Sequence, residues 1–468
     1  MVSEVFSRLQ RTFQSGRTKP LSWRRAQLDA LRRMLAENKQ AIIEAVHADL
    51  RKPAAETLLM EIDLVSDEAR FVRRRMGLWS ARHLKPMHWL LQPAFGWTLA
   101  EPKGVVLVIS PWNYPVLLSL EPMVDAIAAG NAVCLKPSEL SPTISHLMAE
   151  LIERYMDPDA FAVVEGGPEE TTALLDHPFN HIFYTGGGRV GSIVMAAAAK
   201  HLTPVTLELG GKSPCFVDHT VNLNTAARRI AWGKFTNAGQ TCVAPDYVLA
   251  TPDIAQMLAD RIATAVHEFY GADPHDSADF ARIINTRHYD RLMGLLGGAS
   301  ANGIAPANGR LVCGGEGIRD ERYIAPTVLM GTSPDAEVMG EEIFGPILPI
   351  IVVRDADAAI EFINRRSRPL AAYVFSRDDE TRRRFERDTS SGALGYGLPL
   401  GHLISSRLPF GGAGDSGMGA YHGKEGFKVF SHVKTVVDKP QFPDTLRLVY
   451  PPVTALRKTL IGIIAKLS

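Results

Sequence analysis

One cysteine of the chain, Cys242, lies in a polar segment that contains glycine, whereas two others lie in apolar runs. Cys242 ends FTNAGQTC, which follows a helix-like stretch, while Cys134 and Cys215 stand in AVCL and SPCFV. A thiol that serves packing usually has apolar neighbours, and a nucleophilic thiol needs a polar, accessible setting. Cys242 is therefore the candidate nucleophile.

A carboxylate upstream of this thiol supplies a candidate base. Glu208 lies in LELGGK, Leu207–Lys212, and is followed by two glycines. Covalent thiol catalysis that ends in hydrolysis needs a general base to activate water. The pair predicts such chemistry, and the alternative is a strand-end carboxylate in an ion pair with Lys212.

Two glycine patterns have the GxGxxG spacing of phosphate-binding loops. The pattern in YTGGGRVG at 184–191 follows a predicted strand and precedes a predicted helix, where backbone N–H groups can face a pyrophosphate. The same spacing recurs in FGGAGDSG at 410–417 without a preceding strand, so a single match is weak. In a standard Rossmann fold the first match would assign Glu208, about 20 residues on, to the ribose, in conflict with a role as base.

The elements that must position these residues alternate between strands and helices. From Gly104 we expect the strand VVLVIS, a helix near Met123–Ala129, the strand AVCL, the helix ISHLMAELIERY, the strand FAVV and a helix–strand pair ending at HIFYTGG. This alternation predicts parallel strands with crossover helices in a doubly wound sheet, which binds ligands at the carboxyl ends of its strands. A second α/β region follows Glu208, with strands at Tyr247–Thr251, Ile347–Val353 and Ala371–Phe375.

The first hundred residues are expected to be mainly helical, and two further segments read as strands. The helical runs are RRAQLDALRRMLAENKQAIIEAV and ETLLMEIDLVSDEARFVRRRM, whose arginines we expect on solvated faces. FGWTLAEPKG and FKVFSHVKTVV alternate like strands, which predicts a hairpin from part of Leu84–Glu101 and a segment after Gly423. Such a hairpin exposes an edge unless a partner covers it, so we expect a dimer, with a tetramer as the alternative.

Composition describes an ordinary globular protein. The chain has 468 residues, 46% hydrophobic and 22% charged, with 51 Lys and Arg against 51 Asp and Glu. This balance gives no global field that favours nucleic acid. Four cysteines without CxxC spacing suit a reducing compartment, and the N-terminus lacks the apolar core of a signal peptide, so a cytoplasmic location without a metal site is expected.

The C-terminal segment VTALRKTLIGIIAKLS predicts an amphipathic helix. Apolar residues recur at helical spacing and form one stripe: Val453, Leu456, Leu460, Ile463, Ile464 and Leu467. The basic residues Arg457, Lys458 and Lys466 lie off that stripe. The first interpretation is a helix that docks on its own domain or on a partner subunit. The alternative is a helix that makes peripheral contact with a membrane.

Seven motifs together resemble the signature segments of the aldehyde dehydrogenase superfamily, and their order and spacing match over nearly the whole chain. They are SPWNYP at 110–115, LKPSE at 135–139, YTGGGRVG at 184–191, LELGGK at 207–212, FTNAGQTC at 235–242, EEIFGP at 341–346 and LPFGGAGDSGMGAYHG at 408–423. Several motifs in the right context are far more specific than one. The short N-terminal region and FSHVK resemble the class 3 branch, which includes fatty, aromatic and coniferyl aldehyde dehydrogenases.

The resemblance implies a Rossmann-type cofactor domain, an α/β catalytic domain and a bridging hairpin. The cofactor domain would comprise 1–83 and 102–207, and the catalytic domain 208–422. The bridging segments would be 84–101 and 423–445, followed by a tail at 446–468.

The resemblance also implies the chemistry: oxidation of an aldehyde to the acid through a thiohemiacetal and a thioester on Cys242. The side-chain amide of Asn113 and the backbone N–H of Cys242 would hold the oxyanion. Glu208 would activate the hydrolytic water and so release free acid rather than an acyl-CoA. Without the resemblance, Asn113 would more typically stabilise a turn before Pro115.

The expected cofactor is NAD, with NADP as an alternative. By resemblance, Lys136 and Glu139 would hold the adenosine ribose, which frees Glu208 for catalysis, and Glu342 and Phe344 would hold the nicotinamide ribose and ring. Phe344 alone would be interpreted as core. The pyrophosphate would lie against Thr185, Gly186, Gly187 and Gly191, because glycine lets the backbone approach closely.

Substrate choice is weakly specified. Tyr114 would line the aldehyde tunnel and suit a medium- or long-chain aliphatic aldehyde, or an aromatic one. Gly187 replaces the Ser or Asn of many relatives, and Gly397-Leu398 replaces their Asn-Asp, which supports a non-catalytic binding or structural protein as the alternative to an enzyme. His402 and His422 are expected to be structural rather than proton-transfer groups.

Overall fold

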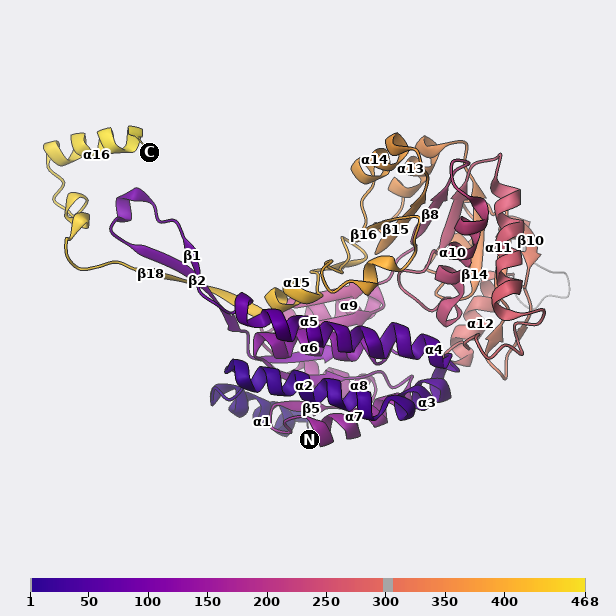
Figure 1. Cartoon of the computed structure of the whole chain (residues 1–468), viewed down its shortest axis with the longest axis horizontal. Coiled ribbons are helices and arrows are strands. Elements are labelled where there is room, and N and C mark those ends of the chain that lie inside the picture. The colour runs from indigo at the N-terminus through magenta and orange to yellow at the C-terminus, as the bar shows by residue number, and fades with distance from the viewer. Residues whose placement is uncertain (1, 298–305, 468) are drawn as a thin grey trace.

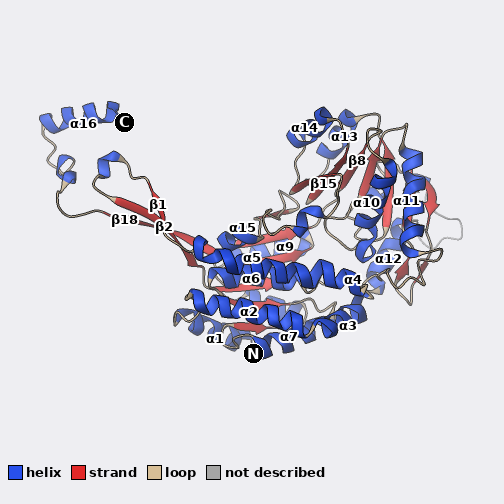
Figure 2. Ribbon diagram, in the orientation of Figure 1, coloured by secondary structure: helices blue, strands red, loops and turns tan. Residues whose placement is uncertain are grey.

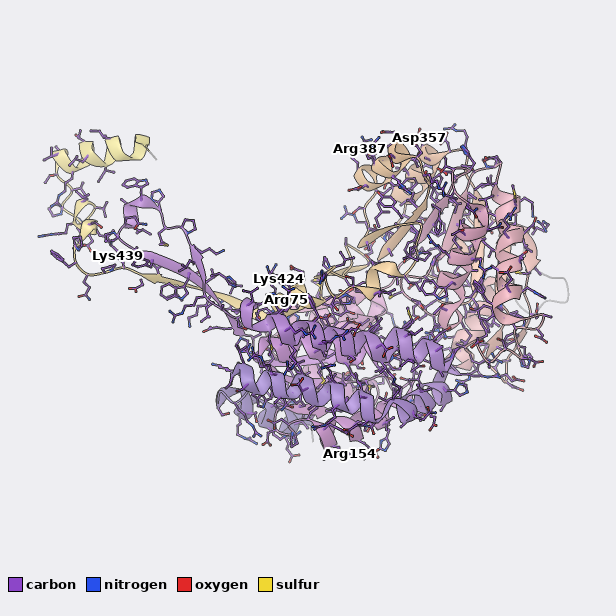
Figure 3. All side chains as sticks on the ribbon, in the orientation of Figure 1. Arg75, Arg154, Asp357, Arg387, Lys424 and Lys439 are labelled. Carbon is purple, nitrogen blue, oxygen red and sulfur yellow. The ribbon has the colours of Figure 1, made fainter. Side chains whose placement is uncertain are left out.

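Two α/β bodies, each built on a mainly parallel sheet, make up the molecule, and a long arm projects from the first (Figure 1). The computed structural model describes residues 2–297 and 306–467. The predicted α/β class with a second α/β region and a bridging hairpin is confirmed. Labelled charged side chains of both signs, such as Asp357 and Arg387, lie on the outer surface (Figure 3).

The first sheet has the strand order β17-β7-β6-β3-β4-β5, and all of its pairs are parallel except β17 with β7. Its central strand is buried along its whole length, as its apolar run VVLVI predicts. The strands are β3 (Val105–Ile109), β4 (Ala132–Lys136), β5 (Phe161–Val163), β6 (His181–Gly186), β7 (Val205–Leu209) and β17 (Gly417–Met418).

Nine α-helices precede or connect these strands in the described part of the chain. They are α1 (Val2–Gln14), α2 (Leu21–Glu37), α3 (Lys39–Leu50), α4 (Ala54–Thr57), α5 (Asp63–Trp79), α6 (Leu117–Ala129), α7 (Pro142–Tyr155), α8 (Pro168–Leu175) and α9 (Gly188–Ala199), and a π-helical turn at Leu58–Ile62 joins α4 to α5.

The first predicted helical run is confirmed and consists of two helices, because Asn38 leaves helical geometry and its side chain donates to Met34 O. The expectation that the arginines are solvated was wrong in part. Arg24 is buried instead of solvated, since its guanidinium donates to the backbone carbonyls of Lys19 and Ala128.

The second sheet has the order β10-β13-β14-β9-β8-β15-β16, parallel except for β10, and helices cover it (Figure 2). The strands expected near 247, 347 and 371 are confirmed. The strands are β8 (Pro214–Val217), β9 (Tyr247–Ala250), β10 (Arg310–Cys313), β13 (Thr327–Met330), β14 (Ile347–Val352), β15 (Ala371–Phe375) and β16 (Ala393–Tyr396), and the helices α10 (Leu223–Phe235), α11 (Ala255–Tyr270), α12 (Thr286–Leu295), α13 (Ala356–Asn364) and α14 (Asp379–Asp388); a two-stranded ribbon joins β11 (Gly317–Ile318) to β12 (Tyr323–Ile324).

The chain passes from the first sheet to the second between Leu209 and Pro214, and it returns to the first through β17. The predicted domain boundaries otherwise stay a prediction. The return is why a segment far along the sequence reaches the neighbourhood of Glu208: Gly417 pairs with Glu208 across the sheet.

The arm is a three-stranded antiparallel sheet of β1 (His83–Lys85), β2 (Phe95–Pro102) and β18 (Ser431–Asp438), which confirms the predicted hairpin. The strand expected from Phe427 begins only at Ser431. Phe427 instead lies in helix α15 (Gly423–Val429), because its ring is buried against Trp79 at a centroid distance of 5.5 Å.

The predicted C-terminal helix is confirmed as α16 (Ala455–Leu467), which lies beyond the tip of the arm and away from both sheets (Figure 1). Leu456, Leu460 and Ile463 are exposed on it. The side chains of Ile464, Lys466 and Leu467 lie outside the described part of the structure. Among the described helices, none has the length and apolarity needed to cross a membrane.

Candidate active site

A cavity of about 370 Å³ opens at the carboxyl ends of the first sheet, where a doubly wound fold presents its loops. It brings together residues that are far apart in the sequence. Of the predicted site residues it is lined by Asn113, Thr185, Gly186, Gly187, Glu208, Cys242, Glu342 and Phe344.

Cys242 reaches the cavity on an unusual loop. After α10 ends, Asn237, Ala238 and Gly239 have φ values of 52°, 50° and 74°, so three successive residues are left-handed. A Cβ on Gly239 would lie 2.3 Å from the carbonyl oxygen of Gly345, which requires glycine there. The loop therefore packs directly against the EEIFGP segment and turns Cys242 towards it.

The Cys242 thiol is held neutral in this setting. Burial raises its pKa above the ordinary value, and the nearby carboxyl groups of Glu342 and Glu208 raise it further, while the backbone N–H groups of Cys242 and Val243 act in the opposite direction. Cys134 and Cys215 are fully buried in β4 and β8, as predicted. Only Cys242 of these three faces the cavity, and it needs a base to become a thiolate.

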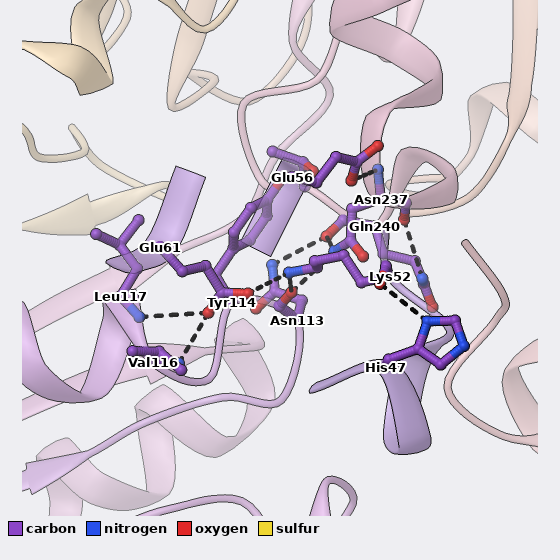
Figure 4. Close-up of polar contacts among 11 residues, drawn as sticks. His47, Lys52, Glu56, Glu61, Asn113, Tyr114, Val116, Leu117, Asn237 and Gln240 are labelled. Atoms are coloured by element: carbon purple, nitrogen blue, oxygen red, sulfur yellow. Dashed lines mark hydrogen bonds and ion pairs between the residues drawn. The ribbon is translucent and has the colours of Figure 1, made fainter. Parts of the chain in front are cut away.

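Asn113 follows β3, and both its side-chain amide and its backbone carbonyl are hydrogen-bonded (Figure 4). Its side-chain Nδ2 donates to the carbonyl oxygen of Gln240 at 3.0 Å. Its own carbonyl oxygen accepts hydrogen bonds from Lys52 Nζ and from Asn237 Nδ2, both at 2.8 Å. The turn-stabilising alternative is thus wrong: the amide spans to the loop of Cys242, and its second N–H remains for a ligand.

A buried ion pair lies behind Asn113. Lys52 Nζ and Glu61 Oε1 are 2.6 Å apart and both side chains are 0% exposed. Glu61 Oε2 accepts the backbone N–H of Val116 at 2.8 Å, and Lys52 Nζ lies 3.9 Å from the centre of the Tyr114 ring. Buried charges persist only when they are paired and hydrogen-bonded, and this pair meets both conditions.

Glu208, at the end of β7, is 2% exposed, and neither of its carboxyl oxygens has a hydrogen-bond partner in the described structure. The predicted alternative, an ion pair with Lys212, is wrong, because Lys212 Nζ pairs with Asp246 Oδ2 at 2.6 Å. Burial raises the pKa of Glu208 well above its ordinary value. A carboxyl group of raised pKa and no partner is suited to exchange a proton with a bound reactant.

The turn from β6 into α9 fits a dinucleotide phosphate. A Cβ on Gly187 or Gly188 would meet no atom within 4 Å, so the backbone at the start of this 12-residue helix is open to a ligand. Thr185 Oγ1 is buried and has no partner in the described structure although Thr185 lines the cavity. These residues supply unused donors where an anion would lie.

Gly186 and Gly191 also lie close to neighbouring side chains. A Cβ on Gly191 would lie 2.9 Å from the Leu209 side chain, and one on Gly186 would lie 2.4 Å from the Tyr184 hydroxyl. Gly191 therefore lets α9 lie close to β7, and Gly186 leaves room for the Tyr184 ring of its own strand. Their predicted contact with a pyrophosphate stays a prediction.

Lys136 and Glu139 lie beyond the residues that line the cavity, at the end of the neighbouring strand β4. Lys136 Nζ donates to Pro137 O at 2.7 Å and lies 3.8 Å from Glu139 Oε2. The Glu139 side chain is 46% exposed and free to meet a ribose. Their predicted role is compatible with this position and stays a prediction.

Glu342 and Phe344 project from the EEIFGP segment into the cavity. The core alternative for Phe344 is wrong, because its ring lines the cavity and meets Trp112 edge-on at 5.5 Å. Burial raises the pKa of Glu342 to about 8. Phe344 has a φ of 50°, a strained value for a non-glycine residue.

The cavity is also lined by residues that motif reasoning missed, among them Trp112, His288 and Arg291. Trp112 belongs to the SPWNYP motif, but nothing in the sequence links the α12 residues His288 and Arg291 to the site. Arg291 Nη2 donates to Ile343 O at 2.6 Å and so holds the EEIFGP segment. Burial lowers the pKa of His288 to about 4, so this imidazole is neutral.

A second, small cavity of about 20 Å³ adjoins the opposite side of Cys242. Tyr114 lines it, and the predicted place of Tyr114 in an aldehyde tunnel stays a prediction. The Tyr114 hydroxyl is 2.9 Å from Thr241 Oγ1. Cys242 therefore lies between a large cavity with polar donors and a small one with mainly apolar walls.

Comparison with known proteins identifies the family. Residues 2–436 match the model of the aldehyde dehydrogenase family. A dog protein named dimeric NADP-preferring aldehyde dehydrogenase is 46% identical over 96% of this chain and 98% of its own length, and mouse aldehyde dehydrogenase family 3 member A2 is 47% identical over 95% and 90%. The substrate-bound structure of Staphylococcus aureus AldH is 39% identical, covers 99% of both chains and has a TM-score of 0.94. The chain belongs to the aldehyde dehydrogenase family.

Proposed function

We propose that this protein oxidises an aldehyde to the carboxylic acid with NAD or NADP, through a covalent intermediate on Cys242. One observation carries the proposal: a single cavity joins Cys242, Asn113 and Glu208 to the open start of α9. Nucleophile, oxyanion donor, base and a phosphate-binding backbone thus face one space.

The Cys242 thiol gives its proton to water, and attack of the thiolate on the aldehyde carbon gives a thiohemiacetal whose oxygen carries negative charge. Asn113 Nδ2 has one N–H fixed on Gln240 O, so its orientation is set before substrate arrives. Its other N–H and the backbone N–H of Cys242 hold the oxyanion. Donors that are already oriented stabilise the transition state without reorganisation.

NAD or NADP bound in this cavity would supply the hydride acceptor for the adduct, and Cys242 would then carry a thioester. Gly187 and Thr185 would hold the phosphates, Lys136 and Glu139 the adenosine ribose, and Glu342 the nicotinamide ribose. A carboxylate at 139 favours NAD, but its side chain is 46% exposed and can turn away from a 2′-phosphate. Because the dog relative is named NADP-preferring, we propose use of both cofactors.

Hydrolysis of the thioester needs a base for the attacking water, and Glu208 takes this role. Its two oxygens have no protein partner in the described structure, so a water can bind them without breaking an existing contact. A base at this position releases free acid, whereas transfer to CoA would not require it.

The substrate has an apolar body, either a medium- or long-chain aliphatic group or an aromatic ring. Tyr114, Leu117, Leu118 and Phe410 line the small cavity beside Cys242 and support this class. A long chain requires the cavity of about 20 Å³ to widen.

The protein forms a homodimer through the arm. Among residues 2–297 and 306–467, no strand pairs with the outer edge of β18, and an unpaired edge is stabilised by a partner. The dog relative is named dimeric. Sedimentation of the full chain at twice the monomer mass supports the proposal, and a monomer contradicts it.

The protein is proposed to be cytoplasmic, and the exposed apolar stripe of α16 supports peripheral contact with a membrane. Leu456 is 72% exposed, and Arg457 and Lys458 are adjacent to it. Removal of residues 453–468 should reduce binding to anionic liposomes and activity on long-chain aldehydes. Unchanged values for both would contradict the membrane proposal.

The activity is tested by reduction of NAD and NADP with aliphatic aldehydes of increasing length, benzaldehyde and coniferaldehyde. We expect acid as the product in the presence or absence of CoA, and no turnover by Cys242→Ser. Binding of NAD without turnover of any aldehyde, or formation of acyl-CoA, would contradict the proposal.

A further inference from the structure

The small cavity beside Cys242 combines apolar walls with one charged pair. Leu117, Leu118, Leu403 and Phe410 supply apolar surface, whereas Glu121 and His422 supply ionisable groups. Of the other polar side chains there, Tyr114 and Thr241 bond to each other, and Tyr421 adds a further hydroxyl. Glu121 and His422 form the ion pair that a ligand in this cavity would meet.

Glu121 belongs to the same face of α6 as the apolar wall. It follows Leu117 by four residues and Leu118 by three, so the helix aligns all three side chains towards Cys242. Glu121 is 4% exposed. A carboxyl group on a wall otherwise made of leucines is costly to bury and calls for a partner with a specific purpose.

His422 enters the cavity from the other side, where its ring pairs with Glu121. It is 3% exposed, and neither ring nitrogen has a well-aligned hydrogen bond within residues 2–297 and 306–467. Nε2 lies 3.3 Å from Glu121 Oε1, and the ring stacks on Phe410 at 5.4 Å. The imidazole is thus placed between its ion-pair partner and the cavity.

The backbone at this histidine is strained and pinned. His422 has a φ of 76°, which side chains other than glycine rarely adopt, and the N–H of Gly423 donates to Glu68 Oε1 at 2.6 Å. Strain of this kind persists where the surroundings enforce it and concentrates at functional sites. The pinning holds the imidazole against the cavity.

The charge of the pair restricts what it can bind. Burial lowers the pKa of His422, but Glu121 and Glu68 outweigh it and hold the pKa above the ordinary value. Glu121 offers an acceptor beside the ring. A distal carboxylate would be repelled by Glu121 and a distal ammonium by the protonated form of His422, whereas a hydroxyl can donate to the carboxylate and accept from an imidazole N–H.

We propose that Glu121 and His422 are specificity determinants that select aldehydes carrying a hydroxyl group at the end remote from the aldehyde. The inference rests on the proposed aldehyde oxidation and deepens it. The class comprises hydroxyaryl aldehydes and ω-hydroxyalkanals whose length brings the hydroxyl to the pair.

The test compares matched substrates: 4-hydroxybenzaldehyde against benzaldehyde, and ω-hydroxyalkanals against alkanals of increasing chain length. We expect kcat/KM to favour the hydroxylated member by about tenfold or more at the best length, because a site built to bond a hydroxyl discriminates against its absence. Glu121→Met should bring the ratio near unity and raise kcat/KM for the unsubstituted member.

A further variant separates recognition from a structural effect. Glu121→Gln keeps an acceptor oxygen and should retain part of the discrimination.

A binding measurement distinguishes failure of this inference from failure of the proposed function. Calorimetry on Cys242→Ala with the same aldehydes needs no turnover and should show the same preference. Equal kcat/KM and equal affinity for hydroxylated and unsubstituted members, a preference for ω-amino or ω-carboxy aldehydes, or an unchanged ratio in Glu121→Met would overturn it. Preserved binding preference without turnover would contradict only the aldehyde oxidation.

Discussion

The groups on the two sides of the Cys242 loop differ in how fully other protein groups satisfy their hydrogen-bonding capacity. Around Asn113, the carbonyl, the side-chain amide and the Lys52–Glu61 pair are all engaged with protein groups. Around Glu208, both carboxyl oxygens are buried without a partner in the described structure. The first side fixes a geometry that the reaction uses unchanged, and the second keeps its bonding capacity for water and protons.

This contrast separates the expected costs of substitution. Groups on the Asn113 side contribute to folding as well as to catalysis, because removing one leaves another buried group unpaired. Glu208 contributes to catalysis at the expense of stability, because a buried carboxyl without partners is unfavourable. Activity and stability should therefore respond differently on the two sides.

The largest expected effect of a substitution is at Glu208, whose carboxyl oxygens have no partner in the described structure. Glu208→Gln removes the base while preserving size, so steady-state turnover should fall by about 10² to 10⁴-fold. The first turnover should still release one reduced cofactor per active site, since acylation precedes hydrolysis. Rapid-mixing absorbance gives both values, and thermal unfolding should show no loss of stability; a lower melting temperature would contradict the contrast.

Asn113→Ala should lower kcat by about 10² to 10³-fold, because one oriented oxyanion donor is lost. It also leaves Gln240 O without its bond from Nδ2, so the melting temperature should fall. Steady-state kinetics with calorimetric unfolding measure the two effects. Changes of equal size in KM and kcat, with an unchanged melting temperature, would contradict the assignment of Asn113 to the hydrogen-bonded side of the loop.

Lys52→Met tests the Asn113 side of the loop without changing a group that contacts the reacting atoms. Glu61 would be left as a buried charge without its partner, which costs about 3–5 kcal/mol. A double-mutant cycle measures this coupling. Its four members are the wild type, Lys52→Met, Glu61→Leu and the variant with both changes, each unfolded by denaturant. The double variant should recover most of the stability, and equal losses in all three variants would contradict the pairing.

The smallest expected effect is a change in pH profile. Because burial raises the pKa of Glu208, its basic form is scarce at acid pH and grows as pH rises. The rate of hydrolysis should therefore increase with pH through that raised pKa. Single-turnover deacylation measured across pH should lose this limb in Glu208→Gln, whereas persistence of the limb would assign it to another group.

The sequence predicts elements whose cause is local. The strand VVLVI and the glycine turn into α9 follow from apolar runs and turn residues, and Cys242 was distinguished from Cys134 and Cys215 by its neighbours alone. Local pattern failed at Phe427, where an apolar alternation typical of a strand is overruled by packing of the ring on Trp79.

Contacts across long separations were not predictable in the same way. Lys212 is four residues from Glu208, yet it pairs with Asp246, 34 residues away, because the second sheet brings that carboxylate closer. Lys52 supports Asn113 across 61 residues, and Arg291 holds Ile343 across 52. Such pairs depend on how helices and sheets meet in space, which residue order does not encode locally.

The account rests on an acyl group passing through Cys242 and leaving by the action of Glu208. The direct measurement is the intact mass of Glu208→Gln after mixing with NAD and an aldehyde, followed by peptide mapping. We expect a mass increase equal to the acyl group, located on Cys242, in nearly every molecule, and none in the wild type at the same time. An unmodified Cys242, or an adduct on another residue, would contradict the account.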